Sequence, residues 1–449
     1  MPKPNHFKGM ETLERSLRSL GADTSAPYRL LIRKGRVLCA IPRDQKVALR
    51  TLDLYQPQRG QGKLLKAIIR TCIKLGIPCP LLRAWQAEEG HQGAGKQAGV
   101  MVGSPGHLCE RSVAVFRDPQ VWTVVKLAFG EAGTNILKHE ADMLESLEKN
   151  IHTPDLRSFT SDGDEAKLCM GWQDGIAWSN PDISPIVQLL REWHMGSDPL
   201  PLEVFKEWNT ASQILKSYPI WGEAMKQWEE LKLAPSIRHG DLTRPNLRTS
   251  CDGKDLLLVH DWERGAHKGM PAIDLAHYLI QDSCFTRSWS PDEVIRTVIQ
   301  QLRAHPCRGL LIDLGWRDQV YGLLATTIAF NIGSQYFSND SLLRALGDAF
   351  LEEDTALNNG QQDKTALTSK LARTKFSIIT PSYNQSEYIE DCLESVRTQK
   401  ADGIEIEHII IDAQSTDGTV DILEKQKDIL WRSEPDKGIS DAINKGFLM

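Results

Sequence analysis

The stretches HGDLTRPN, His239–Asn246, and LLLVHDWERG, Leu256–Gly265, decide the fold that this chain is expected to adopt. The composition of HGDLTRPN is typical of a loop, and LLLVHDWERG is an apolar strand, LLLVH, followed by polar residues. Both contain carboxylate or carboxamide side chains. Either the two segments meet and form a site for a metal ion and phosphate groups, or they are two ordinary loops. The rest of the chain distinguishes these interpretations.

The composition is that of a folded protein with more than one domain. Its 449 residues exceed the size at which a single core keeps growing, and 41% hydrophobic and 25% charged residues are ordinary values. Nine cysteines without a C-x-x-C pair argue against a zinc site and a disulfide framework. No apolar run is long enough to span a bilayer, so we expect a cytoplasmic protein, and we expect no nucleic-acid partner.

The chain divides into five segments on its pattern of strands, helices and polar breaks. We expect a basic amino-terminal module over 1–95, a small β-rich lobe over 96–172, a helical lobe over 173–353, a linker over 354–372 and an α/β segment over 373–449. Residues 28–57 of the leading module are predicted to be β-rich pairs broken at Pro42.

An amphipathic helix is predicted in RGQGKLLKAIIRTCIKLG, residues 59–76, and it belongs to the most basic part of the chain. Residues 1–75 hold sixteen Lys or Arg and five Asp or Glu. The helix could lie on an anionic membrane surface, which would make the protein membrane-peripheral, or it could hold an anionic substrate. The alternative is the solvated face of an ordinary docked helix.

The polar residues of the two opening stretches suit phosphoryl transfer. Transfer from ATP requires positioned Mg²⁺, a neutralised triphosphate and an acceptor hydroxyl oriented in line. Asn246 and Asp261 are hard oxygen ligands on separate loops, and Mg²⁺ takes few such ligands from a protein. Asp241 could orient or deprotonate the acceptor hydroxyl. The D-x-x-x-x-N spacing is that of the protein-kinase catalytic loop, although H-G-D replaces H-R-D and D-W-E replaces D-F-G.

Together with PAIDLAHYL, residues 271–279, these motifs make residues 100–350 resemble the aminoglycoside phosphotransferase-like kinases. The resemblance implies a two-lobed, α+β protein-kinase-like fold in which Asp274 supports the catalytic loop. It also implies a lysine for the α- and β-phosphates and a helix glutamate that holds the lysine, here Lys126 in VVKLA and Glu140 in KHEADML. A lysine in an apolar strand is costly unless its ammonium is paired, which favours this interpretation.

The remaining nucleotide contacts rest on weaker patterns. Gly103 and Gly106 are the candidates for a glycine-rich loop, although the segment departs from G-x-G-x-x-G. KLCMGWQDG, residues 167–175, resembles the hinge between the lobes, where the backbone at Met170 would meet adenine; an edge strand followed by glycine is the alternative. His194 is interpreted as a structural residue at a helix end.

The carboxyl-terminal segment resembles family 2 glycosyltransferases with the GT-A fold, on FSIITPSYN, HIIIDAQSTDGT and DKGISDAINKG. The resemblance implies a partial, Rossmann-like α/β segment. Residues implied to line the remnant of a nucleotide-sugar pocket are Pro381, Asn384, Asp412, Ser415, Asp417 and Asp441. The sequence ends before a D-x-D-like motif, so we do not expect this chain alone to transfer glycosyl groups; a purely structural α/β cap is the alternative.

These patterns indicate an ATP- and Mg²⁺-dependent phosphotransferase that acts on a hydroxyl of a small molecule or saccharide, linked to glycan biosynthesis. One alternative is a fragment of a glycosyltransferase fusion whose main activity uses nucleotide sugars. The other is a pseudokinase-like binding module. The sequence leaves open the acceptor and the choice between ATP and GTP.

Overall fold

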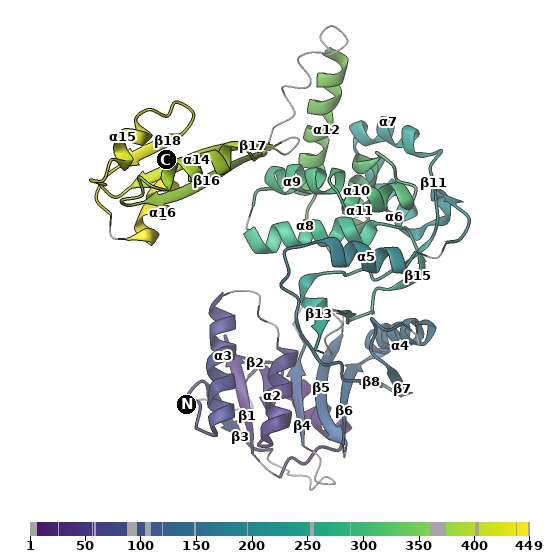
Figure 1. Cartoon of the computed structure of the whole chain (residues 1–449). Coiled ribbons are helices and arrows are strands. Elements are labelled where there is room, and N and C mark those ends of the chain that lie inside the picture. Colours follow the sequence, from purple (N-terminus) through teal and green to yellow (C-terminus); the bar gives the residue numbers. More distant parts are fainter. Residues whose placement is uncertain are drawn as a thin grey trace. The chain divides into compact units, whose positions relative to one another are not determined.

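The computed structural model describes residues 7–25, 27–55, 57, 60–87, 97–103, 109–118, 120–147, 150–194, 196–251, 256–287, 289–359, 374–399, 404–436 and 438–447. These residues belong to two units, Met1–Phe350 and Leu351–Met449. Figure 1 shows the elements of each unit.

An antiparallel sheet of eight strands forms the first lobe, in the order β3-β1-β2-β4-β5-β6-β8-β7. Its strands are β1 Tyr28–Arg33, β2 Arg36–Ile41, β3 Leu82–Trp85, β4 Ala98–Val102, β5 Glu110–Asp118, β6 Val121–Phe129, β7 Leu156–Asp162 and β8 Glu165–Gly171. Because β2 pairs with β4, the predicted boundary between residues 95 and 96 lies inside one sheet.

Four helices cover this sheet: α1 Met10–Ser19, α2 Gln45–Leu54, α3 Gly60–Leu75 and α4 Glu131–Ser146. Successive residues of a strand point to opposite faces, so Leu30 packs in the core beneath α1 and Leu31 packs in the core beneath α2 and α3. The prediction of strands throughout 28–57 is wrong after residue 44. Asp44 caps α2 by accepting a hydrogen bond from the Val47 backbone at 2.9 Å, and such a cap favours a helix.

The second lobe is mostly helical. Its helices are α5 Ser184–Glu192, α6 Lys206–Leu215, α7 Pro219–Trp228, α8 Ile273–Arg287, α9 Pro291–Arg303, α10 Cys307–Asp313, α11 Val320–Gly333 and α12 Ser341–Asn359. Nearly every residue of α11 is buried, as expected of a central helix that is apolar all round. The predicted two-lobed α+β fold class is thus confirmed by a sheet-rich lobe followed by a helical lobe.

Short strands between the lobes position the loops that matter for function. Strand β13, Leu247–Ser250, pairs with β14, Leu257–Val259, and with β9, Gly175–Ala177. Strand β12, Ser236–Arg238, pairs with β15, Ala266–Gly269, and a 3₁₀ turn covers Arg244–Asn246. The strands β10 Leu200–Pro201 and β11 Lys232–Leu233 form a separate pair, and Leu202–Val204 is a further 3₁₀ turn.

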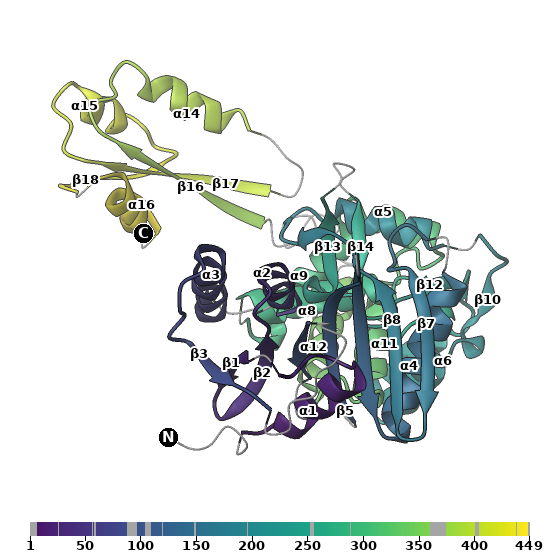
Figure 2. The same cartoon turned by 90° about the horizontal axis from the view of Figure 1, so that it is seen from below.

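The second unit is a small parallel α/β layer. Strands β16 Thr374–Ser382, β17 Ile404–Asp412 and β18 Leu430–Ser433 pair in parallel, with helices α14 Ile389–Arg397, α15 Thr419–Leu423 and α16 Ile439–Phe447. The first two helices pack on one face of the sheet and α16 packs on the other, as Figure 2 also shows. This arrangement confirms the predicted partial α/β segment.

Residues 354–359 of the predicted linker continue α12, and residues 360–372 lie outside the described residues. In the part of the chain that the structure describes, no helix has both the length and the apolar character required to cross a membrane.

Candidate active site

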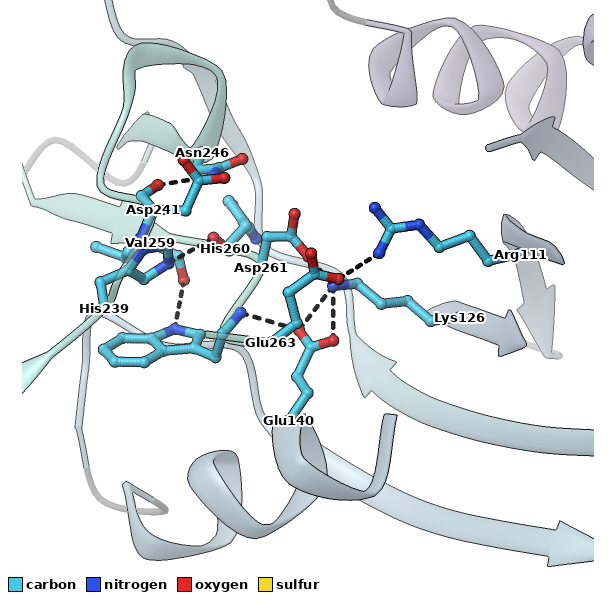
Figure 3. Close-up of polar contacts among 11 residues, drawn as sticks. Arg111, Lys126, Glu140, His239, Asp241, Asn246, Val259, His260, Asp261 and Glu263 are labelled. Carbon is cyan, nitrogen blue, oxygen red and sulfur yellow. Dashed lines mark hydrogen bonds and ion pairs between the residues drawn. The ribbon is translucent and has the colours of Figure 1, made fainter. Parts of the chain in front are cut away.

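Three of the predicted site residues form one ionic cluster, drawn in Figure 3. Lys126 lies on β6 and Glu140 lies on α4, and the lysine Nζ is 2.7 Å from Oε1 and 2.8 Å from Oε2 of the glutamate. The same Nζ lies 2.5 Å from Oδ1 of Asp261 in the D-W-E segment. The Glu140 side chain is only 1% exposed, so its charge depends on the lysine.

The charges of this cluster determine its protonation. Burial acts to raise the pKa of Asp261, but Lys126 and, to a smaller extent, Arg111 together outweigh burial and lower that pKa to about 2. Burial acts to lower the pKa of Lys126, yet the Asp261 and Glu140 carboxylates raise it above its ordinary value. Burial raises the pKa of Glu140, with Lys126 opposing. At neutral pH the structure therefore presents an ionised Asp261 beside a protonated Lys126.

The D-W-E segment is anchored to the first lobe by two further contacts. The Trp262 backbone amide donates to Oε1 of Glu140 at 3.1 Å, and Glu263 forms an ion pair with Arg111 on β5. Asp261 itself has a φ of 73°, a left-handed conformation that costs energy for a residue other than glycine. Arg111 was not singled out from the sequence, because nothing near it in the chain marks it as a partner of residue 263.

Asp274, at the start of α8, holds the loop that contains the H-G-D motif. Its carboxylate accepts the backbone N–H of His239 at 2.5 Å and that of Gly240 at 2.8 Å, as the resemblance implied. The His239 Nδ1 accepts the backbone N–H of Asp241 at 3.2 Å, so the ring proton is on Nε2, which donates to the His260 carbonyl at 2.9 Å. One histidine therefore links the two loops.

The Gly240 backbone explains why glycine stands in the middle of this motif. Its φ is 83°, and a Cβ at this position would lie 2.4 Å from the carbonyl oxygen of Arg264. Any side chain would meet backbone that cannot move aside easily.

The Asp241 carboxylate is surrounded by donors that sequence reasoning missed. The Tyr336 hydroxyl donates to Oδ1 at 2.5 Å, and Nε2 of His277 lies 3.6 Å from the same oxygen. The Asn331 amide donates to Nδ1 of His277 at 3.2 Å, so the ring proton is on Nε2, the nitrogen near Asp241. Burial acts to raise the pKa of Asp241, but His277 and Tyr336 outweigh it and lower that pKa.

Asn246 and Asp261 come from adjacent backbones. The His260 backbone amide donates to the Asn246 carbonyl at 2.9 Å, which ties together the loops before and after β13 and β14. The Asn246 amide nitrogen donates to Oδ2 of Asp241 at 3.1 Å, whereas its Oδ1 accepts no hydrogen bond from the described residues. One amide oxygen and one ionised carboxylate fit Mg²⁺, which retains several waters.

Among the described residues, no group of three or more His, Cys, Asp or Glu side chains is arranged to hold a metal ion. The predicted magnesium set contains one carboxylate and one amide, so it does not require such a group.

A cavity of about 340 Å³ lies beside the ionic cluster. Of the residues predicted to contact the nucleotide, Gly103, Lys126 and Met170 line this cavity, and Gly106 lies outside the described residues. The Gly103 backbone lies close to the backbone of β5, since a Cβ at Gly103 would lie 2.7 Å from the Arg111 carbonyl oxygen.

Among the other residues that line the cavity, Leu54, Trp172 and Arg248 were not predicted from the sequence to do so. Leu54 ends α2, so the amino-terminal module contributes to the wall of this cavity. Arg50, one turn earlier in α2, places its guanidinium 4.8 Å from the Trp172 ring centre. These contacts cross from the module predicted over 1–95 to the hinge segment.

A second cavity, of about 630 Å³, lies in the unit Leu351–Met449. Pro381 is the predicted residue that lines it, together with Tyr383, Tyr388 and Asp436. The other predicted residues of this unit make structural contacts instead: Asn384, Asp412, Ser415 and Asp417 join the loops after β16 and β17 by hydrogen bonds, and Asp441 lies 3.4 Å from Lys445.

Comparison with known proteins identifies relatives of the carboxyl-terminal segment. Residues 377–449 match the model of glycosyl transferase family 2. An uncharacterized glycosyltransferase of Mycobacterium tuberculosis is 42% identical over 73 residues, which are 16% of this chain and 28% of the relative. A Bacillus subtilis glycosyltransferase provisionally named for teichuronic acid biosynthesis is 51% identical over 76 residues, 16% of this chain and 29% of the relative. The chain thus spans less than a third of these relatives.

A solved structure similar to the preceding part is a thermostable mutant of aminoglycoside phosphotransferase APH(4)-Ia. The alignment of this chain with the apo form of that enzyme has a TM-score of 0.37 and 12% sequence identity, and it covers 57% of this chain and 94% of that chain. The same enzyme has been solved in a ternary complex with ADP and hygromycin B, with a TM-score of 0.36 and 10% identity over 56% of this chain and 93% of that chain. Residues 377–449 are therefore similar to family 2 glycosyltransferases. The unit before them has a sheet-rich lobe followed by a helical lobe.

Proposed function

We propose that the unit Met1–Phe350 is an ATP- and Mg²⁺-dependent phosphotransferase that acts on a hydroxyl of a small molecule or saccharide. The observation that carries this proposal is the meeting of Lys126, Glu140 and Asp261 next to a loop that presents Asp241 and Asn246. These five polar residues come from both lobes and meet beside a cavity. If they had only a structural role, their convergence at this one place would be a coincidence.

Each residue has a role that its contacts support. Lys126, held by Glu140, neutralises phosphate oxygens of the nucleotide in the cavity. Asp241 accepts the proton of the acceptor hydroxyl, or orients that hydroxyl, and its lowered pKa favours orientation over strong basicity. Asn246 and Asp261 would hold Mg²⁺, which when bound neutralises charge on the transferred phosphoryl group.

The test is ADP release from ATP with a panel of acceptors that includes neutral sugars, amino sugars, uronic acids and small alcohols. We expect Asp241→Asn and Asp261→Asn each to reduce turnover by about 100-fold or more, because each removes a group that acts on the reacting atoms. Asp318→Asn is the matched control, since Asp318 is 83% exposed in a surface ion pair with Arg308. Wild-type turnover in both site variants would overturn the assignment.

A link to glycan biosynthesis is proposed from the second unit. Residues 377–449 match family 2 glycosyltransferases and enclose a cavity of about 630 Å³. The second candidate function is therefore nucleotide-sugar-dependent glycosyl transfer by the whole protein. Calorimetric titration with UDP-sugars checks it, using Tyr388→Ala to alter the cavity wall. Saturable binding that this variant weakens would support the candidate, and no binding would dismiss it for this chain.

The third candidate is a pseudokinase-like binding module. ATP binding detected by thermal shift, with no ADP release over the entire acceptor panel, would favour this module over the phosphotransferase.

A further inference from the structure

Helix α3, Gly60–Leu75, has two apolar faces, and the described residues of its unit cover only one of them. Its inner face places Ile69, Cys72 and Ile73 in the core beneath α2. On its outer face, Leu64 is 64% exposed and Leu75 is 66% exposed. These two leucines are eleven residues apart, which is three helical turns, so they lie on one line along the helix.

This outer stripe continues past the end of the helix. Ile68 is 43% exposed between the two leucines, and Ile77 and Leu81 are 47% and 41% exposed just beyond. Half of the ten exposed large hydrophobic side chains in the described part of Met1–Phe350 thus fall within eighteen consecutive residues. Such clustering marks an interaction surface, whereas single exposed apolar residues are normal.

The charged residues of the segment that carries the stripe have a single sign. Residues 60–87 contain five Lys or Arg and no Asp or Glu. Two of these cations face inward: Lys66 donates to the Tyr55 carbonyl at 2.7 Å, and Arg70 pairs with Asp53 at 2.6 Å. Lys63 and Lys74 are exposed, and they also lie three turns apart, along one edge of the stripe.

We propose that this outer face of α3 docks on an anionic lipid bilayer, with the helix lying in the plane of the surface. The leucine and isoleucine side chains enter the boundary between headgroups and acyl chains, and Lys63 and Lys74 meet anionic headgroups. Figure 1 shows α3 at the edge of its lobe. A symmetric contact between two copies would bring the same lysines together without an acidic partner from residues 60–87, which disfavours self-association as the use of this face.

The test is flotation of the full chain with vesicles of phosphatidylcholine, with and without phosphatidylglycerol. We expect binding to the anionic vesicles that weakens with salt, and little binding to neutral vesicles. The double variant Leu64→Glu/Ile68→Glu should lose binding by at least about tenfold. Ile312→Glu is the matched control, because Ile312 is 52% exposed on α10, and this variant should bind like the wild type.

A second pair of variants separates the charge from the apolar stripe. Lys63→Ala/Lys74→Ala changes only exposed side chains, so folding should be retained, and vesicle binding should fall by about 30-fold. The proposal is overturned if the wild type ignores anionic vesicles, or if both double variants bind as well as the wild type. It is also overturned if light scattering shows a wild-type dimer that Leu64→Glu/Ile68→Glu converts to a monomer, since the face would then join two copies.

Discussion

Replacing Lys126 with Met removes the ammonium from the ionic cluster while retaining an apolar side chain of similar length. Glu140 is 1% exposed and lies 2.7 Å from the lysine, so its carboxylate would lose its cation without gaining water. Removing one partner of a buried ion pair costs about 3–5 kcal/mol, because the other charge remains buried. We expect Lys126→Met to lower the free energy of unfolding of the unit Met1–Phe350 by about that amount.

A double-mutant cycle with Glu140→Gln isolates the interaction. The double variant Lys126→Met/Glu140→Gln leaves no buried, unpaired Glu140 charge, so its cost should be smaller than the sum of the single costs by about 1–3 kcal/mol. Lys138→Met is the control, because Lys138 lies on α4 with Glu140. Its side chain is 61% exposed and 3.4 Å from Asp142, so we expect about 0.5 kcal/mol or less.

Urea unfolding followed by tryptophan fluorescence measures these changes in the full chain. Of the 12 tryptophans, all except Trp431 lie in the unit Met1–Phe350, so the signal reports that unit. The reasoning is refuted if Lys126→Met costs no more than Lys138→Met, or if the cycle is additive. Either result would mean that the Lys126 ammonium does not neutralise a buried carboxylate.

Three further outcomes are expected. Tyr336→Phe removes a hydrogen-bond donor that lowers the pKa of Asp241, so the pKa of Asp241 should rise. The acid limb of the kcat/KM profile against pH should then move to higher pH, and an acid limb that does not move would contradict this. Gly240→Ala should lower the free energy of unfolding by about 1–3 kcal/mol from backbone strain alone, as measured by denaturant unfolding. Gly222→Ala is the control and should not lower it, because a Cβ at Gly222 would meet open space. The pKa of Asp261 is about 2 in the folded state and 3.8 ordinarily, so its contribution to stability is present above pH 4 and is lost as the pH falls from 4 to 2. Asp261→Asn should therefore make the free energy of unfolding depend less on pH between pH 4 and pH 2.

Much of the candidate site was predictable because its signals are local in the sequence. A lysine in an apolar strand needs an anion, and Lys126 indeed meets Glu140 from the following helix. Asp241 and Asn246 are five residues apart on one loop, and this spacing, taken with the D-W-E and PAIDLAHYL motifs, predicted that they act together. The α/β order of the last unit also followed from alternating apolar runs and helical periods.

Other parts of the site could not be predicted, because the partners are far apart in the chain. Tyr336 reaches Asp241 across 95 residues, and Arg111 reaches Glu263 across 152. A tyrosine or an arginine can stand in almost any amphipathic segment, so nothing in its neighbourhood names its partner. The sequence also suggested a separate module over 1–95, whereas strand pairing between β2 and β4 makes one sheet.

By itself, the sequence determined the local chemistry of this protein: which residues carry charge, where most of the strands and helices form, and which polar groups share a loop. Only the tertiary structure decided which charges neutralise one another and that donors from α8 and the segment after α11 surround Asp241. It also decided that the described residues of its unit leave one apolar face of α3 uncovered. The physical reason is that periodicity shows only that a helix has an apolar face. Whether that face is buried depends on chain packing from distant positions.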